Sequence, residues 1–294
     1  MSESNKRNFI VHGSILAIAG ILVRIIGMLY RIPVVNIIGS EGNGIYGAAF
    51  NIYNIMLVLS SYGLPMAVSK LVSARFTKRR YKSAAKVLRC SLMVAVCTGG
   101  IAALLVFFGA SFIENVIYGG GLPGLAIPLR ILAPTIFLVA ILGVIRGFFQ
   151  GQSTMIPTAV SQILEQIVNA IVSIAAGYGM MKAFASSPDV AAYGAAGSTL
   201  GTAMGALTAV LFMGFLYAIY TPTFNRLKRK DRHTENQSTG QICKIIIYTM
   251  IPIILGQTFY QISALIDDVM FSNIMVGRDT VSYTHLTLPT TPYV

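Results

Sequence analysis

Four long stretches of this sequence carry no charged residue, and they limit the folds that the chain can adopt. They span residues 42–69, 90–113, 190–225 and 245–266. Each reaches or exceeds the roughly 20 residues that an α-helix needs to cross about 30 Å of hydrocarbon. Only 11% of the 294 residues are charged, whereas roughly 25% is usual in a soluble domain. The chain is therefore predicted to be an all-α, polytopic membrane protein.

Glycine and proline residues divide the chain into about seven predicted transmembrane helices. These helices span about residues 9–37, 45–65, 87–113, 126–149, 157–181, 191–220 and 245–271. A glycine-rich loop at 39–44 is predicted to separate the first two, and a turn at 119–124 to precede the fourth. The stretch 66–89 is basic and partly apolar, which predicts a helix lying along the membrane surface.

Lysine and arginine residues are concentrated in alternate connections between the predicted helices. The net charge is +12, and basic residues gather at 6–7, 70–89, 146 and 226–244 but are rare near 41, 114 and 182–189. By the positive-inside rule, this alternation predicts a cytoplasmic N-terminus. It also explains the charge without nucleic acid, because no soluble domain with interleaved aromatic and basic residues is evident.

Two arginines, Arg24 and Arg31, interrupt the apolar sequence of the first predicted helix. An arginine at bilayer depth costs roughly 2.5–3.5 kcal/mol, so it usually faces a bundle interior or a wet cavity. Their spacing of seven places both within about 20° on one helix face, which is a candidate anion-binding surface. If the helix enters the membrane near Phe9, Arg24 lies roughly 22 Å in and Arg31 roughly 33 Å in. Arg31 then has a second interpretation, in which it snorkels to the far headgroups.

Polar residues mark faces of two other predicted helices. Asn51 and Asn54 of the second helix are open to two interpretations, interhelical hydrogen bonding and cavity lining. The fifth helix carries one polar stripe, formed by Gln162, Glu165, Gln166, Asn169 and Ser173. Glu165 is its only ionisable member, and three roles stay open for it: pairing with an arginine, binding a cation or cycling a proton.

The last third of the chain predicts a change of domain. A ladder of glycines at 194, 197, 201 and 205 predicts close helix packing at the end of a six-helix lobe that spans 1–220. The polar stretch 221–243 is interpreted as a cytoplasmic linker, and 244–280 as the first helix of a second lobe. The Thr/Pro-rich segment 281–294 resembles the translation of a transposon end used in sequencing libraries. We therefore expect a non-native tail. Because most of the second lobe is then missing, we also expect the fragment to be inactive alone.

The sequence shows no residue set with the spacing of an active site. It has no histidine near a nucleophile, no carboxylate pair at catalytic spacing and no nucleotide-binding loop. Cys90, Cys97 and Cys243 are too far apart in the sequence for a zinc site. We expect no enzymatic activity, no catalytic residue, no metal and no cofactor.

Three blocks carry a family resemblance: RIIGMLYRIP at 24–33, SYGLPMAVSK at 61–70 and RGFFQGQSTMIPTAVSQILEQ at 146–166. They resemble the stage V sporulation protein B family of polysaccharide-biosynthesis transporters, in the multidrug/oligosaccharidyl-lipid/polysaccharide exporter superfamily. The resemblance implies a MATE-like fold with two lobes around a cavity in the bacterial cytoplasmic membrane. It implies a flippase that moves an undecaprenyl-pyrophosphate-linked glycan or a peptidoglycan precursor by alternating access. Arg24 and Arg31 match arginines that hold the pyrophosphate, whereas Asn51 stands where lipid II flippases have a basic residue.

Two other functions stay open at the level of the sequence. One is a cation-coupled multidrug exporter with Glu165 as its coupling site, and the other is a non-transporting membrane scaffold. Arginines that face the cavity disfavour the first, since they would repel an organic cation. The complete protein is predicted to be a monomer surrounded by membrane lipids, with no nucleic-acid partner.

Overall fold

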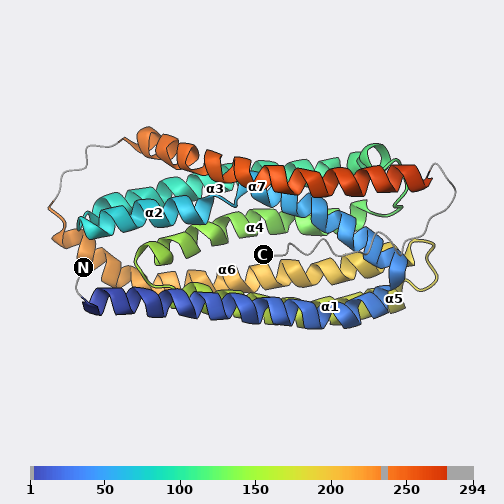
Figure 1. Cartoon of the computed structure of the whole chain (residues 1–294), viewed down its shortest axis with the longest axis horizontal. Helices are drawn as coiled ribbons and strands as arrows, with labels where there is room; N and C mark the ends of the chain where they lie inside the picture. Colours follow the sequence, from blue (N-terminus) through green and yellow to red (C-terminus); the bar gives the residue numbers. More distant parts are fainter. Residues whose placement is uncertain (1–2, 233–237, 277–294) are drawn as a thin grey trace.

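The computed structural model describes residues 3–232 and 238–276, which form an elongated bundle of helices (Figure 1). The helices are α1 (Glu3–Ser60), α2 (Leu64–Thr77), α3 (Tyr81–Phe112), the short π-helix η1 (Ile113–Ile117), α4 (Ala126–Gly151), α5 (Ile156–Ala183), α6 (Val190–Lys230) and α7 (Thr239–Val276). The described residues contain no β-strand. This architecture confirms the predicted all-α fold. The predicted tail 281–294 lies outside the described residues.

Helix α1 crosses the bundle once and then folds back at Gly39 to begin a second crossing (Figure 1). Gly39 has φ 71° and ψ −177°, a backbone conformation that is essentially open only to glycine. Six stretches of the described residues are long and apolar enough to span a membrane, and the first, Gly13–Thr77, contains this reversal. Because this first stretch crosses twice, the six stretches give seven crossings, which agrees with the predicted seven. The predicted loop at 39–44 was wrong in length, because the helix resumes at once at Ser40.

Helix α2 completes the second crossing and does not lie along the membrane surface, as the prediction for residues 66–89 had it. Its apolar face is fully buried, with Leu64, Ala67, Val68 and Val72 each 0% exposed. This face packs directly against glycines of α4, where no side chain would fit. A Cβ on Gly147 would lie 2.6 Å from the Pro65 carbonyl oxygen, and one on Gly151 would lie 2.7 Å from Val72 Cβ. The apolar positions of α2 are thus occupied by its contact with α4.

The glycine ladder of α6 confirms the close packing predicted for it. A Cβ on Gly201 would lie 2.0 Å from Ser173 Oγ, and one on Gly197 would lie 2.4 Å from the Ala176 carbonyl oxygen. Gly194 and Gly205 meet α5 in the same way, at Met181 and at the Glu165 carbonyl oxygen. Helices α5 and α6 therefore approach each other more closely than any larger side chain would allow.

The predicted linker 221–243 is helical over much of its length. Helix α6 continues to Lys230, because Phe224 is 1% exposed and stacks on Phe76 of α2. The buried carboxylate of Asp231 then accepts a 2.9 Å hydrogen bond from the backbone N–H of Lys82, in the first turn of α3. Helix α7 follows, and its residues Ile242, Ile246 and Met250 are buried in one cluster with side chains of α2 and α3. The helix that was expected to open a second lobe therefore packs on the first.

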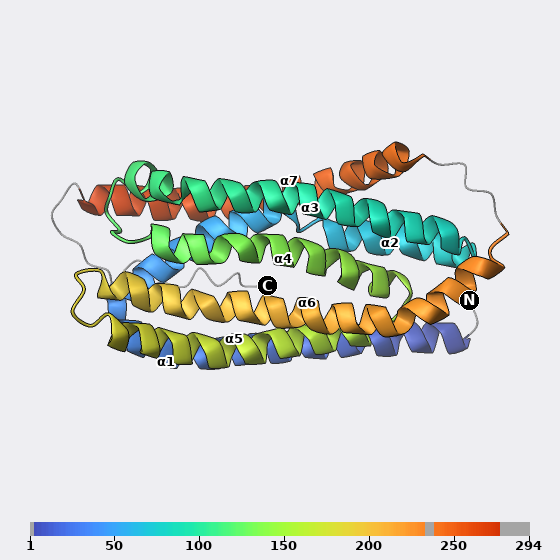
Figure 2. The ribbon, with the colours of Figure 1, turned by 180° about the vertical axis from the view of Figure 1, so that it is seen from behind.

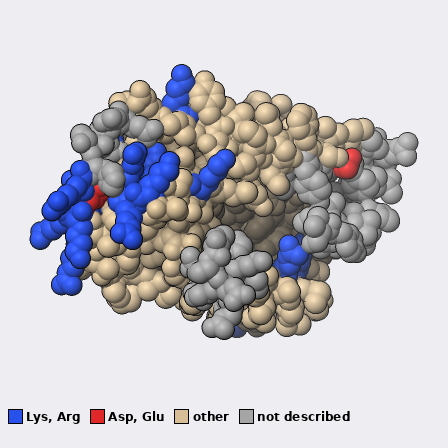
Figure 3. Space-filling view, turned by 60° about the vertical axis from the view of Figure 1, so that its left-hand side comes forward, with Lys and Arg blue, Asp and Glu red and all other residues tan. Residues whose placement is uncertain are grey.

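The basic residues gather at one end of the bundle (Figure 3). The start of α1, the α2–α3 and α4–α5 connections and the end of α6 all lie at this end, and the chain reversal at Gly39 lies at the other (Figures 1 and 2). The alternation of basic and non-basic connections in the sequence is thus an alternation between the two ends of the molecule.

Candidate functional site

The first arm of α1 runs beside α5 in the same direction, and two contacts fix how the helices are aligned (Figure 2). Asn169 Nδ2 donates a 3.3 Å hydrogen bond to the Tyr30 hydroxyl, 139 positions away. A Cβ on Gly27 would lie 3.1 Å from Gln166 Nε2, at the same sequence separation. This alignment places Arg24 about level with Ile163, and Arg31 about level with Ala170, in the middle of α5.

Tyr46, on the arm of α1 that returns after Gly39, lies near the level of Arg31. Tyr46 is 5% exposed and lies within electrostatic range of Tyr30 and Arg31. Arg31 precedes Gly39 by eight residues and Tyr46 follows it by seven, so the reversal brings the two to one level. Arg31 therefore lies about 12 Å before the end of the first arm. Arg24 and Arg31 are both exposed on the described bundle, and their depth in the membrane stays a prediction.

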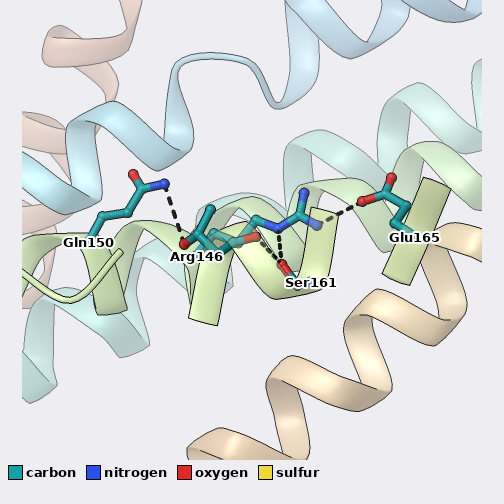
Figure 4. Close-up of polar contacts among 5 residues, drawn as sticks. Arg146, Gln150, Ser161 and Glu165 are labelled. Atoms are coloured by element: carbon teal, nitrogen blue, oxygen red, sulfur yellow. Dashed lines mark hydrogen bonds and ion pairs between the residues drawn. The ribbon is translucent and has the colours of Figure 1, made fainter. Parts of the chain in front are cut away.

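A second layer lies nearer the basic end, where Arg146 of α4 meets Glu165 of α5 (Figure 4). Arg146 Nη2 lies 2.7 Å from Glu165 Oε2, and the two side chains are 14% and 27% exposed. Arg146 Nε also donates a 2.9 Å hydrogen bond to Ser161 Oγ, whose hydroxyl donates to the Thr158 carbonyl oxygen. Of the three roles predicted for Glu165, the structure shows the pairing with an arginine.

Tyr53, on the returning arm of α1, belongs to this second layer. It is 5% exposed and lies within electrostatic range of Glu165. Tyr53 follows Tyr46 by seven residues, as Arg31 follows Arg24, so each pair lies within about 20° on its own helix. The candidate site thus has two layers. The upper layer, farther from the basic end, contains Arg31, Tyr30 and Tyr46. The lower layer, nearer the basic end, contains Arg24, Tyr53, Arg146 and Glu165.

The upper part of the α5 stripe joins helices together. Ser173 Oγ lies 2.9 Å from Asn169 Oδ1 and 2.8 Å from the Ser198 carbonyl oxygen of α6. With its bond to Tyr30, Asn169 links α5 to α1, and Ser173 links α5 to α6. Gln162 and Gln166 are half-buried, and Gln166 lies against Gly27. One stripe in the sequence therefore serves both packing and the site.

Asn51 and Asn54 lie on the returning arm of α1, and both are half-buried. They stand about 140° and 80° around that helix from Tyr46, so they occupy a different part of its circumference from the two tyrosines. Their contact with a substrate stays a prediction.

Arg146 and the three tyrosines were not among the site residues predicted from the sequence. A signal for Arg146 was present, because it opens the 146–166 block and the α4–α5 connection is short enough to return Glu165 to it. The seven-residue spacing of Tyr46 and Tyr53 was a second signal. Their meeting with Arg31 and Glu165 depends on the reversal at Gly39, which brings distant segments together.

The charged side chains of the two layers are three arginines and one glutamate, so the candidate site is positive. The face shown in Figure 3 is hollowed near its centre, and a Lys or Arg side chain borders the hollow. Arginine guanidinium groups bind carboxylates and phosphates through paired N–H donors. Chemically, this arrangement suits a large anion.

A bundle of membrane-length helices with polar and charged side chains between its inner faces defines a multi-pass membrane protein of the transporter class. The chain belongs to the polysaccharide biosynthesis protein family, whose model matches residues 10–286. This match confirms the resemblance to a polysaccharide-biosynthesis family found in the sequence.

Two curated relatives come from Bacillus subtilis (strain 168). Lipid II flippase MurJ is 34% identical over 176 residues, which cover 58% of this chain and 32% of MurJ. Stage V sporulation protein B is 30% identical over 210 residues, which cover 71% of this chain and 39% of that protein. The chain thus spans less than half the length of each relative.

A solved structure shows the same fold. The crystal structure of MATE in complex with MaD3S aligns with a TM-score of 0.66 and 17% sequence identity, and the match covers 83% of this chain and 52% of that one. At this sequence identity, the structural similarity supports the fold alone. The predicted MATE-like architecture is confirmed.

Proposed function

We propose that this chain forms the substrate-binding part of a flippase that moves an undecaprenyl-pyrophosphate-linked glycan across the bacterial cytoplasmic membrane by alternating access. Membership of the polysaccharide biosynthesis protein family and the likeness to MurJ and stage V sporulation protein B support a flippase or exporter. The observation that carries the choice of substrate is the position of Arg31, level with the middle of α5 and within electrostatic range of Tyr46.

The charge of the site matches the pyrophosphate group of such a substrate. Arg24 and Arg31 lie on one face of α1, roughly 10 Å apart along its axis. Each guanidinium offers a planar fork of donors that matches phosphate oxygens. An arginine at this depth costs free energy unless an anion or a polar cavity surrounds it. The lipid tail can remain in the bilayer while the two arginines hold the headgroup.

We propose the following arrangement in the membrane. The basic end faces the cytoplasm, in keeping with the positive-inside rule, which places the N-terminus there. Helices α1 to α6 form the first lobe, now extended from the predicted boundary at residue 220 to Lys230. Helix α7 begins the second lobe, and the complete protein works as a monomer.

The competing function is a cation-coupled multidrug exporter. The MATE-like fold is compatible with it, but the site is less so, because Arg146 pairs with Glu165, the residue that would couple a cation. The remaining charges of the two layers, Arg24 and Arg31, would repel an organic cation. A non-transporting scaffold has no use for two arginines on one face of an otherwise apolar helix.

Binding to the full 294-residue chain in lipid nanodiscs tests these alternatives. We expect undecaprenyl pyrophosphate to bind, and Arg31→Gln to weaken binding about tenfold, since a hydrogen bond to a charged group contributes roughly 1.5–3 kcal/mol. Arg130→Gln is the matched control. Arg130 is exposed and donates a hydrogen bond to Ser111, at the end of α3 and α4 that is opposite to the basic end of the bundle. It should bind as the wild type does.

Two results would contradict the flippase. Tetraphenylphosphonium binding in place of the pyrophosphate lipid indicates the drug exporter. Absence of binding by both probes, with Arg31→Gln equal to the wild type, indicates the scaffold.

A further inference from the structure

The pair formed by Arg146 and Glu165 lies at the same level of the bundle as Arg24. Gln166 marks this level, because it lies against Gly27, less than one turn along α1 from Arg24. Arg146 comes from the last two turns of α4 and Glu165 from the third turn of α5 (Figure 4). The lower layer therefore contains a third arginine, from a helix different from the one that carries Arg24 and Arg31.

Arg146 is held by two contacts of different kinds. Its Nε is bound to Ser161, which is 0% exposed and is itself fixed to the Thr158 carbonyl oxygen. Its Nη2 contacts Glu165 Oε2, which belongs to the more exposed of the two charged side chains. Ser161 thus holds the guanidinium in place, whereas the partner of Nη2 can change without movement of the backbone.

A carboxylate and a phosphate are equivalent partners for a guanidinium, since both offer paired anionic oxygens. A half-buried arginine left without any anion is strongly disfavoured, whereas an exchange of one anion for another keeps it paired throughout. Glu165 also has a second neighbour, because Tyr53 lies within its electrostatic range. The Tyr53 hydroxyl can donate to the carboxylate once it leaves Arg146.

We propose that Glu165 is the resident counter-ion of Arg146, and that a phosphate of the substrate replaces it when the site fills. This inference rests on the proposed function and extends it. Arg146 becomes a third phosphate-binding arginine, and Glu165 becomes a residue that sets affinity by competing with the substrate. Such competition suits a flippase, because the returning carboxylate helps to release the phosphate into the other leaflet.

Three variants of the 294-residue chain test the exchange, with undecaprenyl pyrophosphate as the probe in nanodiscs. Glu165→Gln removes the competing charge, so binding should tighten about tenfold. Adding Arg146→Gln to Glu165→Gln should abolish that gain and leave binding several-fold weaker than in the wild type, as expected for a lost charge-assisted hydrogen bond. Arg130→Gln again serves as the control for loss of a positive charge outside the site.

The outcomes separate this inference from the function on which it rests. If Arg31→Gln weakens binding but Glu165→Gln does not tighten it, or if the double variant binds like Glu165→Gln, the exchange is wrong and the flippase stands. If the wild type does not bind the lipid, the proposed function itself fails. If Glu165→Gln alone does not give monodisperse protein, the double variant decides, because its two glutamines can hydrogen-bond in place of the ion pair. A double variant that binds the lipid as tightly as the wild type does would overturn the proposal.

Discussion

At the scale of single residues, a polar side chain on a membrane helix takes its role from what the neighbouring helix presents to it. Glu165 and Asn169 are one turn apart on α5 and look equivalent in the sequence. Glu165 meets Arg146, whereas Asn169 bonds Tyr30 and Ser173. The sequence predicted the stripe correctly, but it could not divide the stripe into site and packing residues, because the partners come from segments far away in the chain.

Asp231 is a residue whose role the sequence did not reveal, and it carries a prediction. Its carboxylate accepts the backbone N–H of Lys82 in the first turn of α3, so it acts as an N-cap supplied by another segment. Asp231→Ala should lower the free energy of unfolding by about 0.5–2 kcal/mol. Chemical denaturation of the detergent-solubilised chain measures this change.

The matched control for Asp231 is Asp189, which precedes α6 but makes no side-chain hydrogen bond to that helix. Asp189→Ala should have a clearly smaller effect. Equal losses in the two variants would mean that the charge at a helix end matters rather than the hydrogen bond.

At the scale of helices, glycines at a spacing of three or four residues decide which pairs of helices come closest. The ladder of α6 was recognised in the sequence, and the structure places it on α5. A second ladder, formed by Gly143, Gly147 and Gly151 of α4, was not recognised. The interpretation of residues 66–89 as a surface helix left α4 without a partner there, so its spacing had no evident meaning.

Two glycine substitutions in α6 should have opposite effects on stability. A Cβ at Gly201 would overlap Ser173 Oγ, so Gly201→Ala should lower the free energy of unfolding by about 1–3 kcal/mol. Gly214 has open space around it, so Gly214→Ala should be neutral or stabilise the helix by up to about 1 kcal/mol. Thermal unfolding of both variants in detergent gives the comparison. A similar change in both would show that helix propensity, rather than the α5–α6 contact, sets the effect.

At the scale of the whole molecule, hydrophobicity was sufficient to predict the fold class, but not where each helix ends. The number of crossings follows from the length of the apolar stretches. The extension of α6 to Lys230 depends instead on an aromatic cluster, in which Phe224 packs on Phe76 and Phe148 from other helices. Contacts of this kind arise only after the bundle has formed, so the polar composition of 221–230 was misleading.

The orientation of the whole bundle in the membrane gives the last prediction. Basic residues gather at the end where α6 meets α7, and the opposite end holds the connection between α5 and α6 (Figures 1 and 3). Because basic connections stay in the cytoplasm, Arg229→Cys should react with a membrane-impermeant maleimide only after cells are permeabilised. Ser186→Cys, at the opposite end, should react in intact cells; both positions are exposed. The native cysteines are first replaced by alanine, and that parent protein is the control for background labelling. Labelling of Arg229→Cys in intact cells, with protection of Ser186→Cys, would invert the topology and place the lower layer of the site, with Arg24 and Arg146, nearer the outer leaflet.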